Sequence, residues 1–425
     1  MEQSSFSADA AVVGLGRVGL PLALTLADRG LSVIGIDNDQ ARLGAIRDAR
    51  MPFSEPGAQE VLTRVSANGT LSLDDHVASA AAARHIVITL GTPSFSHIEI
   101  DMRDIRSALD DLLGVLVPGH VLTLRSTVAP GTTEFVAGYL AKHRGFRIGE
   151  EVFVAHVPER IAAGRFLAEI DTLPCIVGGV GERSGDVAAE LFENFSAPIV
   201  KTTPVQAELA KIWANILRYT HFALPNLLMM DCERYGANVF TVIDLINRDY
   251  PRGGIAKPGL TAGTCLRKDF AFSEERSNAP GMLLAVSRVN ESVPLFLLEG
   301  AKRRLGTLAG RRVAVLGLAF KADTDDERDS LSHKLIRMLE RELADVAVHD
   351  PHVASPTVTL DAALQDAEAV FLATNHSEFR DARLLERMAQ ECSKHCLVID
   401  PWDCWGAGQV FGYASELVAL AGAAS

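Results

Sequence analysis

The sequence predicts an α/β protein in which two doubly wound domains are joined by a central helical domain with one long helix. Three observations support this fold class. Apolar strand-like runs alternate with helix-like stretches over residues 1–202, the strand signal nearly disappears over residues 203–305, and the alternation returns over residues 306–425. Strands that alternate with helices are typical of βαβ units and a parallel sheet. We therefore expect three domains with these boundaries.

The N-terminal domain is expected to begin with a strand at residues 10–13, a helix at 18–29 and a β-branched strand at 31–36. Short runs rich in apolar and β-branched residues predict its later strands. These runs are residues 85–89, 121–124, 152–155, 175–178 and 199–201.

The central domain is expected to be helical, because residues 203–235 contain no glycine and repeat apolar side chains at helical spacing. Pro225 should kink this long helix or divide it, since proline lacks the N–H that a helix interior needs. A loop rich in glycine and proline follows at 252–263, and a second helix at about 280–305. The apolar residues of the first helix include Leu209, Ile212, Ile216 and Leu217.

The C-terminal domain repeats the alternation of the first. A helix is expected at 332–343, and both alternating segments open with a strand that leads into a glycine. The two ends of the chain are therefore expected to have related folds. The strands expected in the C-terminal domain are residues 313–316, 346–349, 369–373 and 397–399.

Composition excludes several classes of function. The 425 residues include 41 Lys and Arg against 54 Asp and Glu, a formal net charge of −13, so nucleic acid is not an expected partner. No apolar run reaches the roughly 18 residues of a membrane span, and the acidic N-terminal segment lacks the basic start of a secretory leader. Six cysteines are too few for a disulfide scaffold in a chain of this length, so we expect a reduced, cytoplasmic setting.

A glycine-rich segment at the N-terminus predicts a dinucleotide site. It directly follows a strand and opens a helix, and Asp37 ends the next strand. Glycines permit a tight turn and a close approach to a pyrophosphate, while the carboxylate suits the ribose hydroxyls of NAD and would repel the 2′-phosphate of NADP. The alternative is a tight turn that holds no cofactor. The residues assigned to NAD are Gly14, Gly16, Arg17, Val18, Gly19, Asp37, Thr92 and Thr127.

The segment around Cys265 carries the richest chemistry. Its glycines, including Gly259 and Gly263, allow a ligand to approach closely, and the cation of Lys268 would favour a thiolate at Cys265. If this segment is helical, Cys265 and Asp269 share one face. The alternative is a buried structural cysteine at the start of a helix.

The long helix also carries a polar stripe. Glu208, Lys211, Asn215 and Arg218 recur at helical spacing. Such a stripe is usually a solvated face, and it becomes a site only if the helix crosses a cleft between domains.

At this point the chain resembles a known family, the nucleotide-sugar 6-dehydrogenases of the UDP-glucose/GDP-mannose dehydrogenase superfamily. The resemblance runs nearly from end to end, with the motifs in matching order. They are VVGLGRVGLPLA from Val12, SEPG from Ser54, Thr92-Pro93, STVAPGTT from Ser126, PER from Pro158, ELAKIWAN from Glu208, AGTCLRKD from Ala262 and GLAFKADTDDERDS from Gly317.

This resemblance implies a four-electron oxidation of a sugar C6 hydroxyl to a carboxylate, with two NAD reduced. Cys265 matches the nucleophile that forms a thiohemiacetal and then a thioester. Lys211 and Asn215 match a pair that stabilises an oxyanion, and Asp269 matches a carboxylate linked to proton transfer. Two further residues match positions near the reacting carbon but have plainer alternatives, a helix N-cap for Thr127 and a surface carboxylate for Glu159.

The resemblance also implies the substrate. Lys321 and Arg328 match residues near the nucleotide diphosphate, with a plain charged loop as the alternative. Either Arg248 or Arg252 resembles an arginine that crosses a homodimer, and a monomer by light scattering would contradict that assembly. The motif Pro158-Glu159-Arg160, with Gly164-Arg165 after it, resembles the branch that acts on UDP-N-acetylmannosamine or UDP-N-acetylglucosamine. Substrate binding is therefore assigned to Glu159, Arg160, Arg165, Lys211, Asn215, Arg252, Gly259, Gly263, Lys321 and Arg328.

Other functions stay open at this point. UDP-glucose or an unusual UDP-amino sugar is the alternative substrate, and a two-electron hydroxyacid dehydrogenase or a non-catalytic nucleotide-sugar-binding regulator is the alternative class. No metal is expected, because Cys392, His395, Cys396 and Cys404 fit no standard zinc spacing. Asp350 ends a strand as Asp37 does, but no complete glycine fingerprint precedes it, so no second NAD site is assigned.

Overall fold

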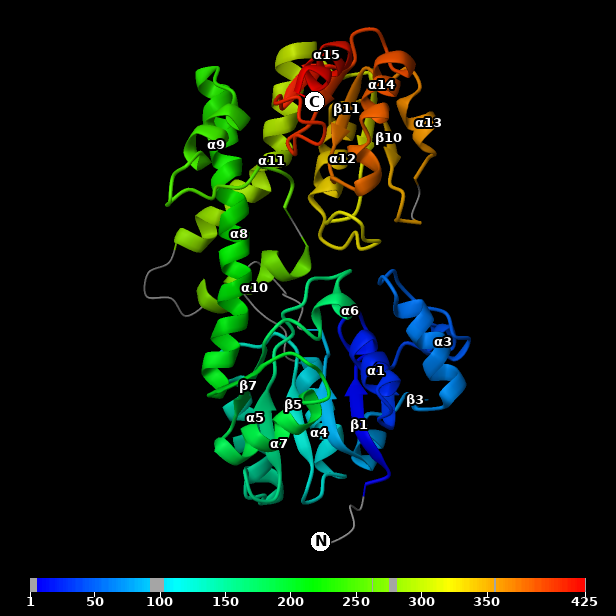
Figure 1. Cartoon of the computed structure of the whole chain (residues 1–425), viewed down its shortest axis with the longest axis vertical. Coiled ribbons are helices and arrows are strands. Elements are labelled where there is room, and N and C mark those ends of the chain that lie inside the picture. The colour runs from blue at the N-terminus through cyan, green and yellow to red at the C-terminus, as the bar shows by residue number, and fades with distance from the viewer. Residues whose placement is uncertain (1–5, 92–102, 262, 275–280, 355–356, 425) are drawn as a thin grey trace. The chain divides into compact units, whose positions relative to one another are not determined.

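The structure is a computed structural model (Figure 1). It describes residues 6–91, 103–261, 263–274, 281–354 and 357–424, and within these the side chains of all but residues 264, 265, 423 and 424. The chain divides into two compact units. The first unit contains residues 1–214 and 271–276, and the second contains residues 215–270 and 277–425.

The first unit contains an eight-stranded sheet with the order β3-β2-β1-β4-β5-β6-β7-β8. All neighbouring strands are parallel except β6 and β7, which are antiparallel. That pair departs from the predicted parallel sheet, and β3 was not expected. The strands are β1 (Ala8–Val13), β2 (Val33–Ile36), β3 (Leu71–Asp74), β4 (Ala83–Ile88), β5 (Val121–Leu124), β6 (Phe153–His156), β7 (Cys175–Gly179) and β8 (Ile199–Thr202).

Helices cover both faces of this sheet. Ala10 and Val12 pack on one face with α1, α3 and α7, while Ala11 and Val13 pack on the other face with α4 and α5. The doubly wound arrangement is therefore confirmed. The helices are α1 (Gly19–Asp28), α2 (Gln40–Arg47), α3 (Ala58–Asn68), η1 (Val77–Ala82), α4 (Arg103–Leu113), α5 (Thr132–Arg144), α6 (Phe166–Glu169) and α7 (Glu182–Phe192).

The central segment is helical, as predicted. Its longest element is α8 (Pro204–Tyr235), whose 32 residues include Pro225 in the interior. Of the two outcomes expected at Pro225, a division of the helix is wrong, and a kink stays a prediction. The other central helices are α9 (Val239–Asn247), α10 (Thr264–Glu274) and α11 (Met282–Leu305).

One face of α8 exposes large apolar side chains. Ile212 and Ile216 are buried as expected, but Leu209 and Leu217 are exposed, so the second pair does not belong to the core. The homodimer expected from the sequence stays a prediction, and this face is the surface that would serve it. No helix of the described chain is both long enough and apolar enough to cross a membrane. The exposed residues on α8 include Leu209, Trp213, Leu217, Leu224 and Leu227.

The second unit contains a five-stranded sheet with the order β10-β9-β11-β12-β13. Its strands are parallel except for β13, an antiparallel edge strand that was not expected. The strands are β9 (Arg312–Leu316), β10 (Asp345–His349), β11 (Ala369–Leu372), β12 (Leu397–Ile399) and β13 (Phe411–Tyr413). The helices beside them are α12 (Leu331–Arg341), α13 (Leu360–Leu364), η2 (Ser377–Arg380), α14 (Ala382–Glu391) and α15 (Ala414–Ala424).

The two sheets repeat one local design. Gly14 after β1 and Gly317 after β9 both have a φ of +97°. The N–H of Gly14 donates to the carbonyl oxygen of Ile36 at 2.7 Å, and the N–H of Gly317 donates to the carbonyl oxygen of His349 at 2.8 Å. Each turn is therefore bound to the end of the neighbouring strand. The expectation that the two ends have related folds is therefore confirmed.

Candidate active site

The glycine loop between β1 and α1 is shaped to admit a ligand. A Cβ added to Gly19 would lie 1.8 Å from the carbonyl oxygen of Gly14, so only glycine fits there. A Cβ added to Gly16 would meet nothing within 4 Å, so this position has open space beside it. Such a loop leaves room for a pyrophosphate against the backbone at the start of a helix. The same loop contains Arg17 and Val18.

Asp37 ties the end of β2 to this glycine loop. Its Oδ2 accepts the Leu15 N–H at 2.6 Å, and its Oδ1 accepts the Asp39 N–H at 2.9 Å. Arg42 Nη1 contacts both carboxylate oxygens at 2.8 and 2.9 Å. The loop and the carboxylate together fit NAD, and the role of Asp37 toward the ribose hydroxyls stays a prediction, with Arg42 beside this carboxylate. Arg42 was not among the residues predicted from the sequence, although its place five residues after the acid was visible.

Two predicted site residues of the first unit follow β5 and β6. Glu159 is buried, and its Oε2 accepts a hydrogen bond from Arg125 Nη2 at 2.5 Å while its Oε1 accepts the Ile161 N–H at 2.7 Å. The surface-carboxylate alternative for Glu159 is therefore wrong. The N-cap alternative for Thr127 is also wrong, because Gly131 occupies the N-cap of α5.

The polar stripe of α8 is not a solvated face throughout. Glu208 is buried and accepts hydrogen bonds from the N–H groups of Gly131 and Thr133 at 2.7 and 2.9 Å, and from the Thr133 hydroxyl at 2.6 Å. It therefore satisfies backbone donors at the start of α5, which a helix cannot satisfy by itself. Asn215 is also buried, Lys211 is half-buried and Arg218 is exposed.

In the second unit, α10 holds the predicted catalytic segment. The helical prediction for Cys265 and Asp269 is confirmed for the backbone, while the Cys265 side chain lies outside the described part of the chain. Asp269 is fully buried, and its Oδ2 accepts a hydrogen bond from Asn215 Nδ2 at 2.6 Å. Lys268 Nζ lies 3.8 Å from Asp269 Oδ1. Two predicted site residues, Asn215 and Asp269, are thus in direct contact.

The loop before α10 is held by close packing. The Gly259 N–H donates to Asn226 Oδ1 at 2.9 Å, and a Cβ added to Gly259 would lie 2.2 Å from the Trp402 ring. Gly263 has a φ of +98°, and an added Cβ there would lie 2.6 Å from the Phe320 ring. Both glycines are therefore required by their surroundings. Asn226 was not predicted from the sequence, because it lies in no recognisable motif.

The loop after β9 contains Lys321 and Arg328. The Arg328 guanidinium donates two hydrogen bonds to the Asp326 carboxylate, at 2.8 and 2.7 Å, and the side chain remains largely exposed. Arg267 of α10 contacts Asp329 of the same loop at 3.5 Å. The helix of Cys265 and the loop of Lys321 and Arg328 are thus connected within one unit.

Several other predicted residues make contacts close to their own positions in the chain. Arg165 pairs with Glu169 at 2.7 Å, and Arg160 donates to the Pro174 carbonyl. Arg252 donates to the Tyr250 hydroxyl at 3.0 Å, and Arg248 pairs with Asp244 one helical turn away. Thr92 lies outside the described residues.

A buried histidine at the end of β6 predicts a pH dependence of stability. Burial lowers the pKa of His156 to about 3, against about 6.5 in an unfolded chain. Between these values the unfolded state binds more protons, so stability should fall as the pH falls, by about 1.4 kcal/mol per pH unit for this group. We expect His156→Leu to flatten this slope between pH 6.5 and 4 in urea unfolding, while His76→Ala, at an exposed position, leaves it unchanged. Equal slopes in both variants would contradict the assignment.

Comparison with known proteins places the chain. Residues 8–196 match the NAD binding domain of the UDP-glucose/GDP-mannose dehydrogenase family, residues 205–292 match its central domain, and residues 314–407 match its UDP binding domain. A UDP-N-acetyl-D-mannosamine dehydrogenase of Pyrococcus horikoshii is 31% identical over 92% of this chain and 94% of that protein. An NDP-N-acetyl-D-galactosaminuronic acid dehydrogenase of Ralstonia solanacearum is 30% identical over 93% of this chain and 96% of that protein.

Solved structures agree with this placement. A UDP-D-ManNAc dehydrogenase from Pyrococcus horikoshii has a TM-score of 0.84 at 31% identity, covering 91% of this chain and 93% of that chain. A UDP-glucose dehydrogenase from Pyrobaculum islandicum has a TM-score of 0.79 at 30% identity, covering 90% and 93%. The chain belongs to the UDP-glucose/GDP-mannose dehydrogenase family and is an NAD-dependent nucleotide-sugar dehydrogenase.

Proposed function

We propose that the chain oxidises the C6 hydroxyl of a UDP-N-acetylhexosamine, UDP-N-acetylmannosamine or UDP-N-acetylglucosamine, to a carboxylate. The observation that carries the proposal is the Pro158-Glu159-Arg160 motif, together with relatives named UDP-N-acetyl-D-mannosamine dehydrogenase. A relative named for an N-acetylgalactosaminuronic acid favours a second candidate, a different UDP-amino sugar.

The proposed reaction balances as one alcohol, two NAD⁺ and one water giving one carboxylate, two NADH and three protons. When bound, NAD supplies the acceptor for each hydride. The first oxidation converts the alcohol to an aldehyde, and the Cys265 thiolate adds to its carbonyl carbon to form a thiohemiacetal. The second oxidation gives a thioester, and water cleaves the carbon–sulfur bond to release the carboxylate and restore the thiol.

The residues around α10 are assigned to support this chemistry. Asp269 is buried against the amide of Asn215 and accepts or returns the proton that moves when the thiol adds and water attacks. Lys211 and Asn215 donate to the oxygen that becomes negative on the reacting carbon. Glu159 is held as a fixed carboxylate by Arg125 and orients water, with Thr127 beside the reacting carbon.

The nucleotide end of the substrate is assigned to the loop after β9. Lys321 and Arg328 offer two cations to the diphosphate, which planar guanidinium groups recognise well. Because Arg328 is bound to Asp326 and largely exposed, it exchanges this carboxylate for a phosphate with little loss of burial. The loop before α10 packs closely against the second unit at Gly259 and Gly263.

The experiment that tests the proposal follows NADH absorbance with a panel of UDP and GDP sugars. We expect two NADH per substrate with a UDP-N-acetylhexosamine and the highest kcat/KM in the panel for that class. One NADH per substrate would contradict the four-electron reaction and support a simple two-electron dehydrogenase. Two NADH with UDP-glucose as the best substrate would contradict the sugar assignment alone.

A further inference from the structure

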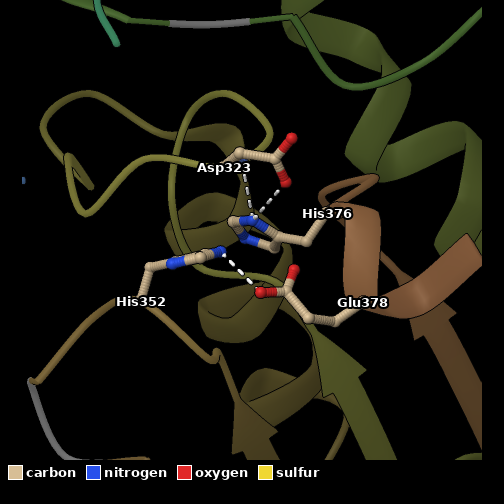
Figure 2. Close-up of side chains that lie close together, drawn as sticks. All are labelled: Asp323, His352, His376 and Glu378. Carbon is tan, nitrogen blue, oxygen red and sulfur yellow. Dashed lines mark hydrogen bonds and ion pairs between the residues drawn. The ribbon is translucent and has the colours of Figure 1, made fainter. Parts of the chain in front are cut away.

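We propose that the second unit contains a binding site for a divalent transition metal of the Zn²⁺ class, formed by Asp323, His352, His376 and Glu378. Each residue offers one ligand atom, and these four atoms lie within 4.8 Å of one another (Figure 2). The residues follow β9, β10 and β11, and the carboxyl ends of these parallel strands meet at one edge of the sheet. In a metal site with bonds of about 2.0–2.2 Å, ligand atoms lie roughly 3–4 Å apart, so small shifts complete the arrangement.

His376 is already oriented as a ligand. Its ring is fully buried, and Nε2 lies 3.0 Å from Asp350 Oδ2. The same Asp350 oxygen accepts the N–H groups of Leu318 and Ala319 at 2.6 and 2.9 Å, so Asp350 acts as an acceptor and the proton belongs to His376 Nε2. Nδ1 then carries the lone pair that faces the cluster, where it accepts the Asp323 N–H at 2.9 Å. A histidine that donates its other N–H to a carboxylate is the usual arrangement around a bound metal.

His352 supplies an independent observation. Its Nε2 is shielded from solvent and lies 3.2 Å from Glu378 Oε1, yet it has no partner with hydrogen-bond geometry. The contact with Glu378 is an ion pair that lacks hydrogen-bond geometry, and a shielded nitrogen without a well-formed hydrogen bond costs free energy. A cation between this imidazole and the Glu378 carboxylate would satisfy both. Asp350 also anchors this residue, because its Oδ1 accepts the His352 N–H at 2.8 Å.

Asp323 shows what metal binding would change. Its φ is +58°, and its N–H donates to His376 Nδ1 at 2.9 Å, while its carboxylate accepts the N–H and hydroxyl of Ser377 at 2.7 Å each. The Asp323 Oδ1 atom lies 4.0 Å from His376 Nδ1. A metal would replace the Asp323 N–H at Nδ1 and draw in the carboxylate. Binding therefore remodels the turn that follows Lys321.

The donor set favours zinc over magnesium or calcium. Two imidazoles with two carboxylates suit Zn²⁺ and neighbouring transition metals, whereas Mg²⁺ and Ca²⁺ prefer oxygen ligands alone. The sequence could not reveal the site, since its donors are spread over three loops. Among the described residues, the cluster is distinct from the cysteines near α14 that the sequence had marked.

The test titrates the full-length, chelator-treated chain with Co²⁺ as a spectroscopic probe and with Zn²⁺ in competition. We expect one ion per chain, visible Co²⁺ bands of a four-coordinate nitrogen and oxygen site, and no sulfur-to-metal charge-transfer band. His352→Ala and Glu378→Gln, both outside the fully buried core, should weaken binding by at least the roughly 10- to 100-fold that loss of an outer partner costs.

The matched control is His333→Ala. His333 also pairs with a glutamate, Glu327, at 3.1 Å in the same unit, but it is not part of the cluster. The His333→Ala variant should bind the metal with the affinity of the unsubstituted chain. Thermal unfolding checks that all the variants are folded. Equal affinity in the His352, Glu378 and His333 variants, a sulfur charge-transfer band, or no bound ion would each overturn the proposal.

Discussion

Replacing Cys265 with serine is expected to lower kcat for acid formation by about 10³-fold or more, because the reaction would lose the group that we propose to hold the aldehyde through its second oxidation. A serine hydroxyl is far less ionised than a thiol at neutral pH, so it adds to the aldehyde poorly. It would also form an ester in place of the thioester, and an ester is hydrolysed less readily. Binding of NAD and the sugar nucleotide should survive, since glycine and charged groups elsewhere are assigned to it. NADH absorbance after a single turnover, with calorimetry for binding, measures both effects.

The control for this prediction is Cys404→Ser. Burial raises the pKa of the Cys404 thiol, so this sulfur stays protonated and unreactive. The control variant should turn over at the rate of the unsubstituted chain. If Cys265→Ser kept that rate as well, the thioester mechanism would be wrong even though the family assignment would stand.

Strand positions were predictable where continuous apolar runs made the signal strong. β5 at Val121–Leu124 and β12 at Leu397–Ile399 lie where the sequence placed them, because both are buried strands with no polar face. The two strands that were not predicted, β3 and β13, both lie at the edge of a sheet. β3 has four residues and is only partly apolar, and β13 has only three residues. The antiparallel pairing of β6 and β7 was also missed, since hydrophobic pattern carries no strand direction.

Site residues were predictable where a local motif carried them. The glycine loop and Asp37 follow from spacing along one βαβ unit, and the structure places them together. The roles of Glu208 and Asn226 depend on partners about 75 and 33 residues away, at Thr133 and Gly259, so no local pattern could reveal them. The solvated-face interpretation of the α8 stripe is wrong for Glu208 and Asn215 but holds for Arg218, because burial depends on which elements pack against the helix.

The second large effect is expected from the buried ion pair of Arg125 and Glu159. Their side chains are only 4% and 9% exposed, and Arg125 lies between the Glu159 carboxylate at 2.5 Å and the Phe192 ring at 5.2 Å. Arg125→Met would leave a buried carboxylate without its cation, which costs about 3–5 kcal/mol of the free energy of unfolding. Urea unfolding measures this loss.

Two companion variants separate the ion pair from a simple loss of packing. Arg147→Met removes an exposed arginine that contacts Glu150 at 2.6 Å, and it should leave the free energy of unfolding nearly unchanged, because solvent screens an exposed pair. Adding Glu159→Gln to Arg125→Met removes the unpaired charge and should recover much of the stability. That double variant should remain inactive if Glu159 orients water, because restored folding does not restore the carboxylate. Equal losses of stability for Arg125→Met and Arg147→Met would mean that the pair of Arg125 and Glu159 is not desolvated. Recovery of both stability and activity in the double variant would mean that Glu159 is a purely structural residue.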